Sequence, residues 1–205
     1  MSKDITLKEY QTIYRIVSSV GEYFSWGAGK SCQFYNVTAA YILSNVLKVK
    51  ARPVMGAAFI YLNDNESGIL SFATQDRLGI GSNENGFHCW LETDENFIDF
   101  TAPEYAEALN SSVPRKMFKK KKHSMVSSLD LLQQRGDFFF SENEILTNNL
   151  LRKMAANPAY QDFMDICSDW YRKYTKKKII TCGIRGDLGK EVQIKLKKCT
   201  LDSAW

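Results

Sequence analysis

The chain has 205 residues and a net charge of +4, with 44% hydrophobic and 13% aromatic residues. This composition is enough to bury a sizeable core and is unlike that of a disordered protein. Its apolar stretches are shorter than the ~18 residues of a membrane-spanning helix, and the first residues lack the apolar core of a signal peptide. We therefore expect a cytoplasmic protein, unless another export route delivers it elsewhere, with neither a membrane nor a nucleic-acid partner.

The cysteines are five in number and form no CxxC pair. This pattern argues against a disulfide framework and against a four-thiolate zinc site, so we expect most of the thiols to be reduced. They are Cys32, Cys89, Cys167, Cys182 and Cys199.

Two helices are predicted first. Thr6 and Glu9 have the spacing of a capping box, and apolar residues recur after them at helical intervals. Two glycines then break the pattern. Ser31 is a suitable N-cap for a second helix that runs to about Leu47, and this helix would carry Cys32 at its buried leading end.

Strand signals follow the second helix. One apolar run predicts a strand over 53–61, and a shorter run predicts another over 69–72. The glycine- and asparagine-rich segment from Gly79 to Gly86 predicts a mobile loop. This loop lies directly before His88, so it could border a substrate cleft.

The next two predicted strands form an antiparallel pair and cover 88–92 and 96–101. A tight turn at Thr93-Asp94, or a slightly wider one, sets Leu91 opposite Asn96 and therefore His88 opposite Asp99. Strand alternation then puts two sets of side chains on opposite faces. One face carries His88, Trp90, Phe97 and Asp99, and the other carries Cys89, Leu91, Ile98 and Phe100.

A concentrated basic run covers Lys119 to Lys122 and is followed by His123. Such a run can attract a phosphate or an acidic partner, but no aromatic residue interleaves with it to stack on bases. We expect a solvated loop here.

The last third of the chain is predicted to begin with helices. Ser141 and Glu144 have capping-box spacing ahead of a helix over 145–155, and Asn157-Pro158 starts another that continues through Trp170. The final predicted elements are a hairpin with strands over 178–184 and 191–196.

These elements predict the α+β class, with the helix that carries Cys32 packed on an antiparallel sheet. We expect one domain over 1–205. Its core covers about 25–105, and the C-terminal helices and hairpin, over about 125–205, form an added layer.

Cys32, His88 and Asp99 occur in an order and in local contexts that suit a cysteine-nucleophile active site. A thiol reacts as its thiolate, which a helix N-terminus and a nearby imidazole both favour. The histidine needs a third group to hold its tautomer and orientation. Asp99 lies inside an apolar strand, where a carboxylate is costly unless it is paired, and His88 is the obvious partner.

Four segments of the chain resemble the transglutaminase-like core of the papain-like cysteine enzymes. They are Cys32-Gln33-Phe34-Tyr35-Asn36, Ala51-Arg52-Pro53-Val54-Met55-Gly56, His88-Cys89-Trp90-Leu91-Glu92 and Phe97-Ile98-Asp99. The Cys-x-x-x-Asn spacing is also similar to that of arylamine N-acetyltransferases, and some uncharacterised bacterial families of the superfamily look similar. The chain lacks the Arg-Gly-Gly that precedes the cysteine of those acetyltransferases, which weakens the case for acetyl-CoA.

The resemblance implies a papain-like fold in which Cys32 is the nucleophile, His88 the general base and acid, and Asp99 the orienting group. The implied chemistry is attack of the thiolate on an amide or thioester carbonyl to give a thioacyl-enzyme. Water then gives hydrolysis or deamidation, and an amine gives acyl transfer. The expected substrate is a peptide, a protein or a small acyl or amide compound, with no cofactor and no metal.

Three further residues have expected supporting roles. The indole of Trp26 either donates to the oxyanion, as an upstream tryptophan does in some transglutaminases, or belongs to the core. Asn36 lies one helical turn after Cys32 and would fix the site or the cysteine loop. Arg52 would pair with a structural carboxylate such as Glu92.

Two other interpretations are open at this point. The chain could be a non-catalytic binding module that keeps the fold and binds a partner through its cleft or through Lys119–Lys122. Alternatively, Cys32, His88 and Asp99 could supply three ligands to a zinc ion.

Overall fold

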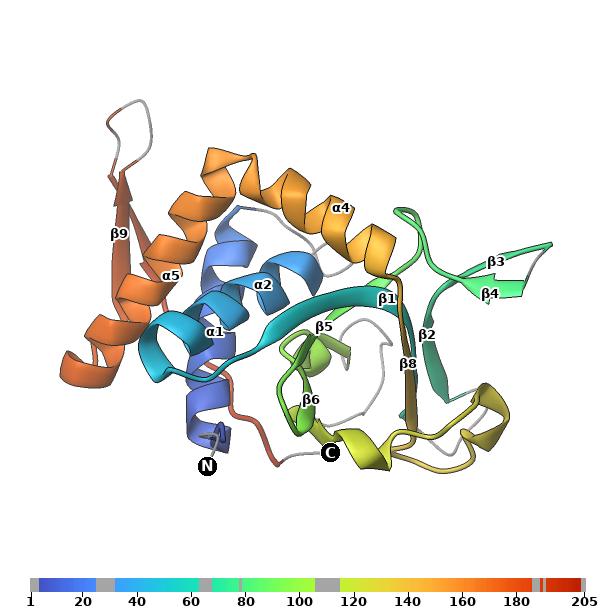
Figure 1. Ribbon diagram of the computed structural model, residues 1–205. Helices are drawn as coiled ribbons and strands as arrows, with labels where there is room; N and C mark the ends of the chain where they lie inside the picture. The colour runs from blue at the N-terminus through green and yellow to red at the C-terminus, as the bar shows by residue number, and fades with distance from the viewer. Residues whose placement is uncertain are drawn as a thin grey trace.

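The structure is a computed structural model that describes residues 4–24, 32–62, 68–77, 79–105, 115–185, 189 and 191–203. Its helices and strands in chain order are α1 (Leu7–Tyr23), α2 (Cys32–Ile42), β1 (Arg52–Tyr61), β2 (Ile69–Phe72), β3 (Thr74–Asp76), β4 (Gly79–Gly81), β5 (His88–Glu92), β6 (Asn96–Asp99), β7 (Phe118–Lys121), β8 (Phe138–Glu142), α4 (Glu144–Ala155), α5 (Pro158–Lys177), β9 (Thr181–Arg185) and β10 (Glu191–Lys195). In Figure 1 the helices gather beside a curled sheet. The α+β class and the antiparallel sheet are confirmed.

The central sheet is built around the long strand β1. β8 pairs along one side of β1, while β5 and β2 pair with successive halves of its other side. β6 and β7 extend the sheet beyond β5, and every one of these pairings is antiparallel. β8 was not predicted, and its place next to β1 means that residues beyond 125 contribute to the central sheet as well as to the helices and hairpin.

Gly56 is the point of β1 where three strands meet. It pairs with His88 of β5 on one side and with Glu142 of β8 on the other. A Cβ atom at this position would lie 2.0 Å from the backbone oxygen of Ser141, which is closer than two non-bonded atoms can approach. Glycine is therefore required at this position of β1, where the backbone of β8 approaches closely and His88 pairs on the other side.

β2 and β5 lie one after the other along β1, like two halves of one interrupted strand. Phe72 pairs with Ala58 and His88 pairs with Gly56, so the two halves meet within two positions of each other. The intervening residues leave the sheet as the β3–β4 hairpin, which projects from the body of the molecule (Figure 1). The predicted mobile loop from Gly79 to Gly86 was therefore wrong in part, because it contains β4 and a bridge between Asn83 and Gly86.

The β5–β6 hairpin has the predicted faces but not the predicted register. Leu91 pairs with Ile98 rather than with Asn96, because the two-residue turn falls at Asp94-Glu95. The register thus differs by two residues, and an even shift leaves every side chain on its predicted face. Trp90 and Phe97 pack inside the curled sheet, whereas Leu91, Ile98 and Phe100 pack against the helices.

The basic run at Lys119–Lys122 was wrongly predicted as a solvated loop. Its first part belongs to β7, which pairs with β6, and Phe118 is buried at its start. Lys119 and Lys121 of this edge strand form ion pairs with Asp4 and Glu95, and Lys122, in the turn that follows, pairs with Glu92. Charged side chains on an edge strand discourage further strand pairing.

The helices follow the sequence signals closely. The predicted capping box of α1 is present, with Thr6 and Glu9 each bonded to the backbone of the other. α2 continues through a π-helical turn to Leu47, where the second helix was predicted to end. Asn157 caps α5 as predicted. The predicted capping box at Ser141 was wrong, because that residue lies in β8 and Asn143 caps α4 instead.

Apolar side chains fill both faces of the sheet. One face packs against α1, α2 and α5, together with the predicted C-terminal hairpin β9–β10. The concave face encloses an aromatic cluster that includes Trp90, Phe97, Phe118, Phe138 and Phe140. Within the described ranges, no helix is both long and apolar enough to cross a bilayer.

Candidate active site

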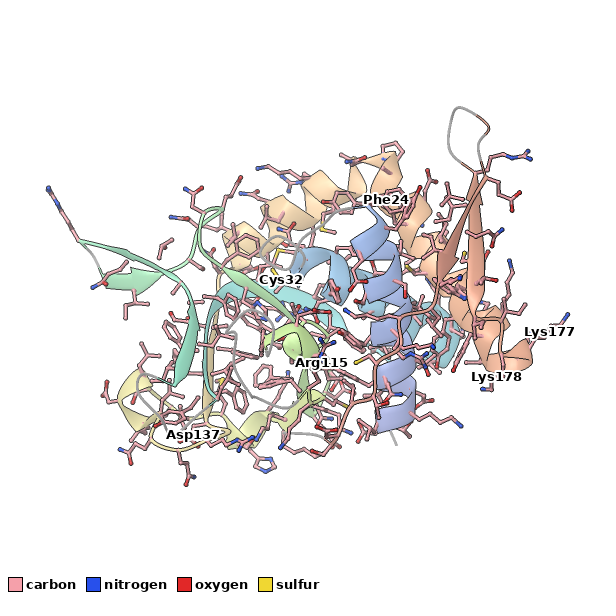
Figure 2. The ribbon with its side chains drawn as sticks, turned by 180° about the vertical axis from the view of Figure 1, so that it is seen from behind. Phe24, Cys32, Arg115, Asp137, Lys177 and Lys178 are labelled. Atoms are coloured by element: carbon pink, nitrogen blue, oxygen red, sulfur yellow. The ribbon has the colours of Figure 1, made fainter. Side chains whose placement is uncertain are left out.

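Cys32 is the first residue of α2 and is partly exposed. The N–H groups at the start of a helix have no partner within the helix, so they favour negative charge beside them. Figure 2 shows Cys32 at the end of α2 that lies toward the strands, far from Lys177 and Lys178 at the end of α5. The predicted N-cap Ser31 and the predicted oxyanion donor Trp26 lie outside the described residues.

His88 and Asp99 form a fully buried pair. Nε2 of His88 lies 2.9 Å from Oδ2 of Asp99, and the exposed fraction of each side chain is 0%. The strand register places Asp99 level with Trp90, so the imidazole reaches the carboxylate diagonally and not from directly opposite, as had been predicted. The pairing survives because both side chains are on the same face.

The pairing with Asp99 favours the protonated form of the His88 imidazole. Burial opposes the charge, but Asp99 and then Cys32 outweigh it and raise the pKa of His88 to about 10. Burial would raise the pKa of Asp99, but the charge and hydrogen bond of His88, with further donors, lower it. The two groups are thus each stabilised in the charged form by the other.

The second imidazole nitrogen of His88 is free to take part in chemistry. Nδ1 is buried and makes no hydrogen bond of standard geometry with a nitrogen or oxygen in the described part of the chain. Cys32 contributes to the raised pKa of His88, which indicates that its thiol lies near the imidazole. With Nε2 held by Asp99, a proton can therefore move between Sγ of Cys32 and Nδ1.

Asn36 lies at the centre of the site, as its spacing from Cys32 predicted. Its Nδ2 is within hydrogen-bond distance of the backbone oxygens of Cys32 and Cys89, at 3.1 and 2.8 Å, and of Oδ1 of Asp99 at 3.0 Å. Its Oδ1 accepts from the backbone N–H of Phe100. This one buried amide joins the start of α2 to β5 and to the end of β6, which makes it a structural anchor of the site.

Tyr105 is a site residue that the sequence interpretation missed. It follows a 3-10 turn over Ala102–Glu104, and its hydroxyl donates to Oδ2 of Asp99 and lies 3.1 Å from Nε2 of His88. No sequence periodicity predicts this contact, because the conformation of the turn after β6 sets the position of the Tyr105 side chain. A general signal was available: a buried carboxylate needs several donors, so further ones had to exist.

The cleft beside Cys32 has a volume of about 770 Å³. Its described lining comes from both ends of the segment between β2 and β5, from the start of α2 and from the two later helices. These residues are Cys32, Gln33, Ser71–Ala73, Glu84–Phe87, Leu150 and Tyr160. The predicted position of 79–86 at the border of a cleft therefore holds for its last residues.

A second hollow, of about 620 Å³, lies at the other end of β5, around Arg52, Glu92 and Lys122. Arg52 lies 3.4 Å from the predicted partner Glu92, but its shorter contact is with Glu142, at 2.5 Å. Lys122 also pairs with Glu92, at 3.1 Å. These charges satisfy one another at the rim of the sheet.

The zinc interpretation finds no support in this geometry. Within the described ranges, no group of three or more His, Cys, Asp and Glu side chains is arranged to hold a metal ion. The nitrogen of His88 nearest to Asp99 is occupied by the hydrogen bond to that carboxylate.

A family model described as "Protein of unknown function (DUF2026)" matches residues 6–205, nearly the whole chain. The chain belongs to this family. A crystal structure named "genomics APC5867" is 29% identical and superposes with a TM-score of 0.85, covering 98% of this chain and 97% of that one. A search of curated proteins found no match. The DUF2026 fold is thus shared with a solved structure over its full length.

Proposed function

We propose that this protein is a cysteine-nucleophile enzyme that processes amide or acyl substrates through a thioacyl-enzyme intermediate. One observation carries the proposal. A buried His88–Asp99 pair leaves Nδ1 of the imidazole without a hydrogen bond in the described residues, and Cys32, a partly exposed thiol at a helix start and beside a cleft, interacts electrostatically with that imidazole. Nucleophile, base and orienting group each have the neighbour that their role requires.

The first half of the reaction acylates Cys32. Nδ1 of His88 takes the thiol proton, and Sγ of Cys32 attacks the carbonyl carbon of the substrate, forming a C–S bond while the carbonyl electron pair moves to oxygen. Backbone N–H groups at the start of α2, which lack partners within the helix, stabilise this oxyanion. The imidazolium then gives its proton to the leaving amine or thiol as the bond to the carbonyl carbon breaks.

The second half releases the acyl group. A water molecule or an amine attacks the thioester, His88 takes a proton from this nucleophile, and the C–S bond breaks. The imidazolium returns its proton to Sγ of Cys32. Water gives a carboxylic acid, so the result is hydrolysis or deamidation, and an amine gives a new amide.

Asp99 contributes by holding the imidazole and by stabilising its charged form. A pKa of about 10 makes His88 a strong enough base to hold the proton that it takes from Cys32. Asp99 itself stays ionised because its oxygens accept hydrogen bonds from His88, Tyr105, Asn36 and the backbone of Thr101.

The arrangement of the elements supports a papain-like, transglutaminase-like fold for this enzyme. The helix that starts at Cys32 packs on an antiparallel sheet whose neighbouring strands supply His88 and Asp99, in the chain order seen in that superfamily. The cleft can admit a peptide segment or a small amide. A cysteine nucleophile must stay reduced, which favours the cytoplasm as its location.

A thiol-selective probe tests the proposal. Cys32, Cys182 and Cys199 are all partly exposed, so Cys182 and Cys199 are matched controls for access. We expect iodoacetamide at neutral pH to modify Cys32 on the order of 10- to 100-fold faster than the controls, as measured by peptide mass spectrometry. p-Nitrophenyl acetate should leave one acetyl group on the wild-type protein and none on Cys32→Ser.

His88→Gln separates reactivity from exposure. The glutamine amide can still donate to Asp99, but it cannot accept the thiol proton, so we expect labelling of Cys32 to slow to the rate of the controls. Equal labelling of the three cysteines in the wild-type protein would refute the proposal. So would a His88→Gln variant that is folded and reacts as fast as the wild type.

A further inference from the structure

The hydroxyl of Tyr105 contacts both members of the His88–Asp99 pair. It donates to Oδ2 of Asp99, which is also the acceptor for Nε2 of His88, and it lies 3.1 Å from that nitrogen. The residue is 2% exposed, and its ring lies 5.9 Å from that of Phe72, which stacks on the imidazole. Tyr105 therefore contacts the pair from inside the sheet and not from the substrate cleft.

Tyr105 can act here only as a proton donor. Burial, with the charge of Asp99 next in importance, raises the pKa of Tyr105 well above its usual value. The phenol thus keeps its hydrogen at every pH at which the enzyme would work. A hydroxyl that keeps its hydrogen holds the positive end of its dipole against Oδ2 of Asp99, next to the imidazole.

The shared oxygen makes the two donors compete. Oδ1 of Asp99 accepts hydrogen bonds from Asn36 and from the N–H of Thr101, so Oδ2 is the oxygen that both His88 and Tyr105 use. An oxygen that already accepts a strong hydrogen bond gives less stabilisation to a second donor.

We propose that Tyr105 is a positioning residue that limits how strongly Asp99 holds the imidazolium of His88. This inference rests on the catalytic role proposed for Cys32, His88 and Asp99. A general acid works best when it can release its proton near the working pH, and a fully buried aspartate alone would hold that proton too tightly. Tyr105 weakens this hold while still keeping Asp99 ionised.

Other titratable groups near His88 set the background for the test. Asp99 faces it from β6, and Cys32 faces it from the start of α2. Cys89 is next to His88 in β5 and interacts with Cys32, and Tyr10 of α1 donates to the backbone oxygen of Asp99. Among these, Tyr105 alone has a hydroxyl bonded to the carboxylate oxygen that holds the imidazole.

Tyr105→Phe tests the proposal because it removes only the hydroxyl. The chain has two histidines, His88 and His123, so their Cε1–H NMR signals can be followed separately as the pH is raised. We expect the midpoint of the His88 titration to rise by about 0.5–1 pH unit in Tyr105→Phe. The signal of His123, in the turn after β7, should be the same in the wild type and in Tyr105→Phe and serves as an internal reference.

Tyr10→Phe is the matched control. It also removes a buried hydroxyl bonded to Asp99, but that hydroxyl meets the backbone oxygen and not the carboxylate. It should lower the melting temperature and leave the His88 midpoint unchanged. If Tyr105→Phe does not fold, 3-fluorotyrosine at position 105, a stronger donor of the same shape, should lower the midpoint instead.

If Tyr105 only stabilised the fold, Tyr105→Phe would not raise the midpoint of the His88 titration. An unchanged or lowered His88 midpoint in a folded Tyr105→Phe protein would overturn the inference, as would an equal shift in Tyr10→Phe. These outcomes are separate from a failure of the proposed function. Iodoacetamide labelling of the same samples shows whether Cys32 is more reactive than Cys199, whatever Tyr105 does.

Discussion

Phe72 stacks on the imidazole of His88, although fifteen residues separate the two along the chain. The ring centroids are 4.4 Å apart, and the ring planes differ by 20°. The contact exists because β2 and β5 follow each other along β1, so the last residue of one half meets the first residue of the other. Phe72 also lines the cleft that contains Cys32, so one ring contacts both His88 and the space beside Cys32.

The stacked ring of Phe72 is expected to favour the charged form of His88. An aromatic face stabilises a nearby cation by about 0.5–2 kcal/mol. Replacing the ring in Phe72→Leu should therefore make His88 a weaker base and slow the reaction of Cys32 with iodoacetamide about fivefold at neutral pH. Phe139→Leu, at a half-buried position of β8 outside the cleft lining, is the control and should react at the wild-type rate.

His88 should make the protein less stable as the pH rises above neutrality. Its pKa is raised from 6.5 to about 10 in the folded protein, so the stability that it contributes is fully present below pH 6.5 and is lost as the pH rises through about 10. Urea unfolding of the wild type and of His88→Gln measures this directly. The free energy of unfolding should fall more steeply between these two pH values in the wild type. Parallel curves would contradict the pairing of His88 with Asp99.

Asn36→Asp should destabilise the fold strongly. The new carboxylate would replace an amide nitrogen that lies 3.0 Å from Oδ1 of Asp99, so two negative groups would meet in a fully buried place. A buried charge without a partner costs about 3–5 kcal/mol, which should appear as a loss of that size in urea unfolding. Asn45→Asp makes the same charge change at an exposed position and should alter stability by less than about 0.5 kcal/mol.

Gly56→Ala should disturb the strand that supports His88. The added methyl group would fall 2.0 Å from the backbone oxygen of Ser141, so β1 and β8 would have to separate. We expect a loss of about 1–3 kcal/mol in unfolding free energy, together with slower labelling of Cys32. Gly81→Ala in β4, where a Cβ atom meets nothing within 4 Å, should change neither quantity. Equal effects of the two substitutions would show that the close contact at Gly56 is unimportant.

Much of the local structure could be read from short-range patterns. The capping box of α1, the cap at Asn157, the faces of the β5–β6 hairpin and the C-terminal hairpin all depend on residues within a few positions of one another. Local signals also misled where tertiary pairing took over. Ser141 has capping-box spacing, and the Lys119–Lys122 run is highly polar. Both segments nevertheless pair with apolar strands of the central sheet, because this pairing satisfies their backbone hydrogen bonds.

The sequence by itself determined which face of the sheet His88 and Asp99 share, because side-chain alternation in a strand does not depend on the rest of the fold. It also determined that α2 begins near Cys32 and that Asn36 lies one turn further on. Only the tertiary structure decided that Nδ1 of His88 is left free beside Cys32, that Tyr105 reaches Asp99, and that Phe72 covers the imidazole. These contacts join segments that are far apart in the chain, and the path of the backbone through turns and crossovers, which no local pattern encodes, brings them together.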